Sequence, residues 1–88
     1  MPGGEFIVSR HAREEMQRRG IEPAAVEEVL RQPEQIVPGH GELRVLQSRM
    51  AAASKQFLLR VVVNDPVDLV VVVTVYRTSK IAKYWRSE

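Results

Sequence analysis

Residues 55–76, KQFLLRVVVNDPVDLVVVVTVY, decide the fold of this chain. Two runs rich in β-branched residues, 55–63 and 69–76, flank the turn-forming segment NDPVD at 64–68, a pattern that predicts an antiparallel hairpin. If Val63 pairs with Leu69 across the loop, the odd-numbered side chains of residues 57–63 and 69–75 share one apolar face. We expect helices to cover that face.

The other face of the hairpin is expected to carry Arg60, Thr74 and Tyr76. An arginine inside an apolar strand is costly to bury without a partner. One interpretation is that this face is a working surface. The other is an ordinary half-solvated sheet, with Arg60 held by Glu34 or Glu42 in a structural ion pair.

Two short helices are predicted before the hairpin. Ser9 suits the N-cap of a helix over residues 10–19, and Gly20 can adopt the left-handed conformation of a C-terminal cap. Pro23 suits the first turn of a second helix, which Pro33 ends. The buried stripe of the second helix is expected to consist of Val26, Val29 and Leu30.

Shorter strands and a tail complete the predicted pattern. Residues 6–8 are a candidate edge strand, residues 35–37 and 43–49 are further strands, and residues 38–41 form a turn. Residues 77–85 read as a short final helix or an edge strand. The predicted fold class is therefore α+β, with two N-terminal helices packed on a small, curved antiparallel sheet.

Length and composition fit one domain over residues 1–88. The chain is 44% hydrophobic and 27% charged, and it has no cysteine that could form a disulfide or a thiolate metal site. The start lacks the layout of a secretory signal, and no apolar run is long enough to span a bilayer. We expect a cytoplasmic protein without membrane contact.

Charge is distributed unevenly along the chain. Residues 1–40 carry five arginines against seven glutamates, whereas residues 41–88 carry eight Lys or Arg against four Asp or Glu. A basic half favours phosphate-bearing or acidic partners, but on charge alone solvated surface charge is the preferred explanation.

The segment SRHAREEMQRRGI at 9–21 resembles the opening pattern S-x-H-A-x-x-R-M-x-x-R-G-I of a family of small uncharacterised prokaryotic proteins. The likeness continues through residues 60–62, 73–76 and 83–85. By layout that family is similar to the RelE and BrnT toxins, and more broadly to the barnase, EndoU and colicin type of RNase. One departure is Glu15, which stands where the family commonly has arginine.

The resemblance implies a RelE/BrnT-like fold and a metal-independent endoribonuclease toxin that is restrained by an antitoxin. Such cleavage needs a base for the ribose 2′-hydroxyl, a cation for the phosphorane and an acid for the leaving oxygen. His11 is the candidate base, Arg60 the phosphate ligand, and Tyr76 the acid or a base-stacking group. His11 could instead be a helix-capping or packing residue.

Thr74, Lys80, Lys83 and Tyr84 are the candidate RNA-binding residues. Tyr84 offers a stacking surface, although it could simply close the core. His11 and His40 are the two histidines, and no metal-ligand spacing or glycine-rich phosphate loop is present. We therefore expect neither a metal nor a cofactor.

Two other functions remain open on this sequence. One is a non-catalytic RNA-binding module. The other is a protein-interaction domain whose strand at 69–75 pairs or packs with another chain.

Val70 and Val72 are expected to lie on the face away from the helices. An exposed apolar patch of this kind predicts either a homodimer or a complex with an antitoxin.

Overall fold

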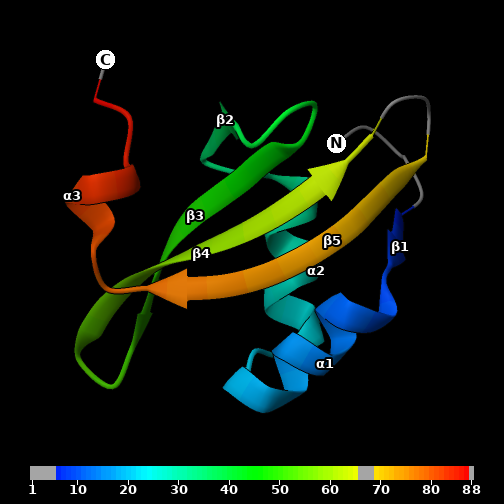
Figure 1. Cartoon of the computed structure of the whole chain (residues 1–88). Helices are drawn as coiled ribbons and strands as arrows, with labels where there is room; N and C mark the ends of the chain where they lie inside the picture. The colour runs from blue at the N-terminus through cyan, green and yellow to red at the C-terminus, as the bar shows by residue number, and fades with distance from the viewer. Residues whose placement is uncertain (1–5, 66–68, 88) are drawn as a thin grey trace.

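The computed structural model describes residues 6–65 and 69–87 (Figure 1). The elements, in chain order, are β1 (Phe6–Val8), α1 (Arg10–Arg19), α2 (Pro23–Arg31), β2 (Gln35–Pro38), β3 (Arg44–Ala52), β4 (Lys55–Asn64), β5 (Val70–Thr78) and α3 (Ile81–Tyr84). The prediction of a small α+β domain is confirmed. Residues 66–68 of the predicted hairpin loop lie outside the described ranges.

The sheet is mixed, not wholly antiparallel as predicted. Its strand order is β1-β5-β4-β3-β2, and β1 runs parallel to β5 while the other neighbours are antiparallel. Short connections force β2 to β5 into antiparallel pairs. Parallel strands need a long connection. The two helices that follow β1 give the chain enough length for β1 to lie parallel to β5.

Both N-terminal helices begin and end as the sequence indicates. The Ser9 hydroxyl accepts a hydrogen bond from Ala12 N at 3.0 Å and donates one to Val73 O at 3.1 Å, so it caps α1 and ties the helix start to β5. Gly20 ends α1 with φ 67°, and Pro23 opens α2.

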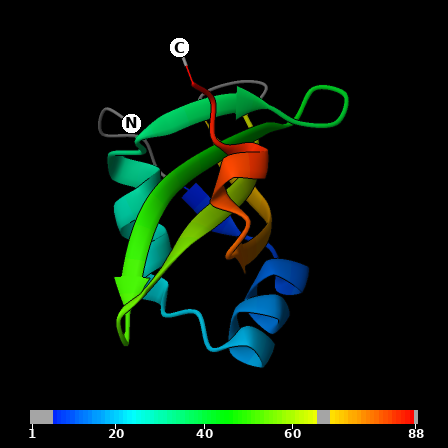
Figure 2. The same ribbon diagram turned by 90° about the vertical axis from the view of Figure 1, so that its left-hand side faces the viewer.

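The main core lies between these helices and one face of the sheet. Its buried members from the helical half and from strands β3 to β5 are Ala12, Met16, Ile21, Val26, Val29, Leu30, Leu46, Leu59, Val61, Val63, Val70, Val72 and Val75. Since Leu46 belongs to this core, its neighbour Gln47 points to the other face, where α3 lies. Figure 2 shows α2 and α3 on opposite sides of β3.

The register of the main hairpin differs from the prediction. Arg60 pairs with Tyr76 and Val62 with Thr74, but Val63 pairs with Val72, so Val73 is an extra residue in β5. Such a β-bulge reverses the inward and outward alternation on either side of it. The prediction that odd-numbered side chains face the helices therefore holds for residues 59, 61, 63 and 75 and is wrong for residues 69, 71 and 73.

Val70 and Val72 consequently face the helices, not the solvent. They are 3% and 0% exposed, so the apolar patch inferred for that position does not exist. The backbone of Val72 is paired on both sides, by β1 and by β4, and that of Val70 is paired with β1. Val70 and Val72 therefore offer no exposed apolar patch to another chain, and a homodimer or an antitoxin complex stays a prediction.

Two further features complete the sheet. The turn between β3 and β4 places Ala53 and Ser54 at φ 53° and 69°, the backbone of a type I′ hairpin, and β3 therefore runs three residues beyond its predicted end. The tail forms α3, the first of the two alternatives. In the described part of the chain, no helix has the length and apolarity needed to cross a membrane.

Candidate functional site

A row of polar side chains crosses four strands on the face away from α1 and α2. Gln35, Gln47, Arg60 and Tyr76 are successive register partners on β2, β3, β4 and β5. Gln47 Nε2 donates to Gln35 Oε1 at 2.8 Å, Arg60 Nε donates to Gln47 Oε1 at 2.8 Å, and Arg60 Nη1 donates to the Tyr76 hydroxyl at 2.5 Å. The row is a continuous hydrogen-bonded chain centred on Arg60.

Arg60 is a buried cation with neutral neighbours. It is 8% exposed, and its guanidinium carbon lies 4.2 Å from the centre of the Tyr84 ring. Among the described residues, no carboxylate forms an ion pair with it: Glu34 pairs with Arg49 instead. The expected structural ion pair to Glu34 or Glu42 is therefore absent from the described part of the chain, and the positive charge is stabilised by dipoles and rings only.

One nitrogen of Arg60 remains open. The described hydrogen bonds use Nε and Nη1, and Nη2 has no partner among the described residues. Every fully buried side-chain nitrogen or oxygen in those residues has a partner, so Nη2 must reach solvent. The guanidinium can thus donate to a ligand without giving up its bonds to Gln47 and Tyr76.

Arg60 opens onto a groove of about 550 Å³. The lining residues come from the turn after β2, from strands β3 to β5 and from α3: Pro38, Gly39, His40, Leu43, Val45, Arg60, Val62, Val73, Thr74, Tyr76 and Tyr84. None of these is acidic. A permanent cation, two phenols, an imidazole and an apolar floor suit an anionic ligand that also carries a flat apolar part.

The C-terminal segment is anchored on the polar row. Gln47 Nε2 donates to Tyr84 O at 3.1 Å, while Gln35 accepts from Arg86 N at 3.0 Å and donates to Arg86 O at 2.6 Å. Trp85 adds a second contact, because its ring lies 4.3 Å from the guanidinium carbon of Arg49. These bonds fix Tyr84 over Arg60 and make α3 one wall of the groove.

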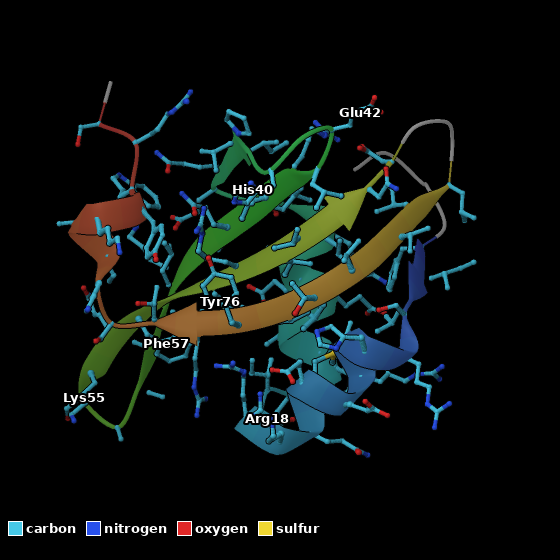
Figure 3. All side chains as sticks on the ribbon, in the orientation of Figure 1. Arg18, His40, Glu42, Lys55, Phe57 and Tyr76 are labelled. Atoms are coloured by element: carbon cyan, nitrogen blue, oxygen red, sulfur yellow. The ribbon has the colours of Figure 1, made fainter. Side chains whose placement is uncertain are left out.

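Four of the seven predicted site residues meet in this groove: Arg60, Thr74, Tyr76 and Tyr84. Lys83 Nζ lies 5.2 Å from the Tyr84 ring centre on the outer side of α3, and Lys80 precedes α3 without lining the groove. Figure 3 shows Tyr76 over the sheet and His40 in the turn above it, whereas Arg18 lies with α1 below.

His11 does not join this group. It is exposed in the first turn of α1, and the same helix packs Ala12 and Met16 into the core on the other face of the sheet. The sheet therefore separates His11 from Arg60 and Tyr76. The three residues expected to act together do not converge.

Glu15 is the centre of an ion-pair cluster on α1. Its carboxylate accepts hydrogen bonds from Arg18 Nη2 at 2.7 Å and from Arg19 Nε at 2.9 Å. The bond from Arg18, followed by that from Arg19, lowers the pKa of the Glu15 carboxyl. Arg18 and Arg19 are thus engaged on the helix and do not supply a free cation at this position.

One residue of the polar row was missed in the sequence, and one groove residue was assigned no such role. Gln47, which is 0% exposed, was not singled out, although a two-residue turn at Ala53 and Ser54 would have placed it opposite Arg60. His40 was considered only for metal or phosphate-loop binding. No group of three or more acidic, histidine or cysteine side chains suited to a metal occurs within residues 6–65 and 69–87.

The chain is a small α+β protein with a groove beside a buried arginine on the sheet face opposite α1 and α2. Residues 8–77 match the DUF4258 family, described as a domain of unknown function, and the chain belongs to this family. No curated protein and no solved structure gives a significant match.

Proposed function

We propose that the chain is a metal-independent endoribonuclease of the RelE/BrnT type that cuts RNA in the groove around Arg60. The observation that carries the proposal is this buried arginine, which lines the groove, has no carboxylate partner in the described residues and keeps one nitrogen without a described hydrogen bond. Burying an uncompensated charge is costly, and a bound phosphate would neutralise it. The arrangement of paired helices before a mainly antiparallel sheet is consistent with that type of RNase.

The chemistry divides among three side chains of the groove. A base takes the proton of the ribose 2′-hydroxyl, the 2′-oxygen attacks phosphorus, and the bond to the 5′-oxygen breaks as that oxygen receives a proton. Arg60 would hold the phosphate and the charge that develops on it. Because the Tyr76 oxygen accepts from Arg60, its own proton remains available for the leaving oxygen.

His40 is assigned as the base in place of His11. Its side chain lines the groove that contains Arg60 and Tyr76, whereas His11 lies on the helical side of the sheet. The products would carry a 2′,3′-cyclic phosphate and a 5′-hydroxyl. As a toxin of this type, the protein would act in the cytoplasm and be restrained by a cognate antitoxin.

The experiment is incubation of mixed RNA with purified protein in EDTA, with and without ribosomes, and analysis of the product ends. Arg60→Ala should slow cleavage by ~10²–10³, and Arg60→Lys should recover part of the rate because a point charge cannot clamp two oxygens. Arg77→Ala is the matched control, since it removes the same charge from an exposed position outside the groove. Its rate should equal that of wild type.

The alanine variants of the two histidines serve as controls for each other. His40→Ala should slow cleavage by ~10²–10⁴, the usual worth of a positioned base, and His11→Ala should leave it unchanged. The reverse result would return the base to His11 and contradict the assignment by geometry. Absence of cleavage by wild type under all conditions would exclude the enzyme.

A non-catalytic RNA-binding module is the second candidate. The observation in its favour is the cover over Arg60, which leaves the side chain only 8% exposed beneath the Tyr84 ring. A guanidinium so fully packed could serve binding and anchor α3 without supporting turnover. Retention of RNA binding by wild type, lost in Arg60→Ala but not in Arg77→Ala, together with no cleavage, would identify this function.

A further inference from the structure

The β-bulge in β5 brings two consecutive side chains into the groove. Residues next to each other in a regular strand point to opposite faces, yet Val73 and Thr74 both line the groove. Val73 is the residue without a register partner on β4, and Thr74 pairs with Val62. Bulges beside binding sites commonly re-aim side chains in this way. The bulge in β5 therefore adds one apolar side chain and one hydroxyl, that of Thr74, to the lining of the groove.

Among the residues that the structure describes, the Thr74 hydroxyl has no hydrogen-bond partner. Three other Ser or Thr hydroxyls that are not fully exposed or lie at element ends are engaged: Ser9 and Ser48 bind backbone groups, and Thr78 accepts from Lys80 N at 3.1 Å. No hydrogen bond joins the Thr74 hydroxyl to any described residue, although the side chain is half-buried at the groove. A half-buried hydroxyl gains from a partner that a ligand can supply.

Apolar side chains surround this hydroxyl. Val45, Val62 and Val73 form the floor, and Tyr84 and Arg60 stand beside it. A volume of about 550 Å³ falls in the range of sites that hold one small ligand. A flat ring with a hydrogen-bonding edge, attached to an anion that reaches Arg60, matches this combination of surfaces.

We infer that the groove holds a single unpaired RNA base next to the phosphate bound by Arg60, and that Thr74 reads the edge of that base. The inference rests on the proposed action on RNA and adds its substrate class, single-stranded RNA. A base within a duplex is stacked and paired, so its faces and edge are not available to such a pocket. Thr74 is therefore a specificity-determining residue and not one of the groups that move protons.

The test uses short single-stranded RNAs that differ only in one nucleotide, A, C, G or U, which carries a 2′-deoxyribose so that it cannot be cleaved. Binding is measured by fluorescence anisotropy, with the same RNA in a duplex for comparison. Wild type should prefer one base over the weakest by roughly threefold to tenfold, the worth of one hydrogen bond. It should bind the duplex more weakly than the single strand.

Variants of Thr74 then assign the preference. Thr74→Val has the same shape without the hydroxyl and should bring the four affinities together, while Thr74→Ser should keep the preference. Ser79→Ala, which removes an exposed hydroxyl outside the groove, should behave as wild type. Circular dichroism and urea unfolding show that each variant is folded.

The outcomes separate this inference from the proposed function. Base preference that Thr74→Val abolishes, without cleavage of any cleavable RNA, supports the base pocket and overturns the nuclease. Cleavage with equal binding of all four bases, or with a preference that Thr74→Val retains, overturns the role of Thr74 and leaves the nuclease. Equal binding of duplex and single strand overturns the unpaired-base pocket, and no RNA binding at all overturns both.

Discussion

Arg60 Nε donates a hydrogen bond to Gln47 Oε1 at 2.8 Å, and both side chains are buried on the face of the sheet opposite the N-terminal helices. A neutral amide thus takes the place that a carboxylate would fill in a structural ion pair. The bond orients the guanidinium while leaving its full charge, and that is why the groove can attract an anion.

Removal of the Gln47 amide should destabilise the fold. Gln47→Leu leaves Arg60 Nε without its acceptor and removes one donor from Gln35 Oε1 and from Tyr84 O. We expect a loss of about 2–3 kcal/mol in the free energy of unfolding. Urea unfolding at neutral pH measures it. Gln56→Leu makes the same change at an exposed position of β4 and should stay within about 0.5 kcal/mol. Equal effects of the two variants would show that the polar row contributes nothing.

The bulge predicts an order of stability for two neighbouring valines. Val72 is 0% exposed in the core and Val71 lies half-buried on the other face. Val72→Ala should therefore cost about 2 kcal/mol, through lost burial and a cavity, and Val71→Ala less than about 1 kcal/mol. If urea unfolding gave the reverse order of stability, the result would contradict the bulge and support a regular strand register.

Tyr84 should act through its ring and not through its hydroxyl. Its ring covers the Arg60 guanidinium at 4.2 Å, so Tyr84→Ala should cost about 1 kcal/mol of stability, whereas Tyr84→Phe should cost little. If RNA stacks there, Tyr84→Ala should also weaken RNA binding by about 1–3 kcal/mol. Urea unfolding measures the change in stability, and fluorescence anisotropy titrations measure the change in RNA affinity. Loss of binding in Tyr84→Phe would point instead to a role of the hydroxyl.

Acid should cancel the contribution of the ion pair between Glu34 and Arg49. The hydrogen bonds from the Arg49 side chain and backbone lower the pKa of the Glu34 carboxyl below its ordinary 4.5. The unfolded state then binds more protons in that range, so the contribution is fully present above pH about 4.5 and is lost as pH falls through the lower, folded-state pKa. Both side chains are partly exposed, and screening keeps the effect below about 1 kcal/mol.

The measurement compares wild type with Glu34→Gln by urea unfolding at neutral and at acid pH. The variant should be less stable at neutral pH and equal to wild type once Glu34 is protonated. Glu42→Gln, an exposed site whose side chain has no described partner, should match wild type at both. A stability gap that widens in acid would contradict the assigned sign.

The sequence by itself determined the elements and most of the core. Ser9, Gly20 and Pro23 set the helix ends because capping and φ restriction act within a few residues. Residues 55–63 and 70–78 form strands because β-branched side chains suit a pleated surface. These are local preferences, and a single chain shows them directly.

Tertiary structure alone decided which functional side chains meet. The bulge at Val73 and the turn at Ala53 and Ser54 set the strand registers, and neither carries the asparagine or glycine signal by which such turns are found in a sequence. A shift of one residue in the strand register moves a side chain to the opposite face of the sheet. For that reason Gln47 lies opposite Arg60, and Val70 and Val72 lie in the core. His11 lies on the far side because α1 packs on the other face of the sheet, and His40 lines the groove from the turn after β2.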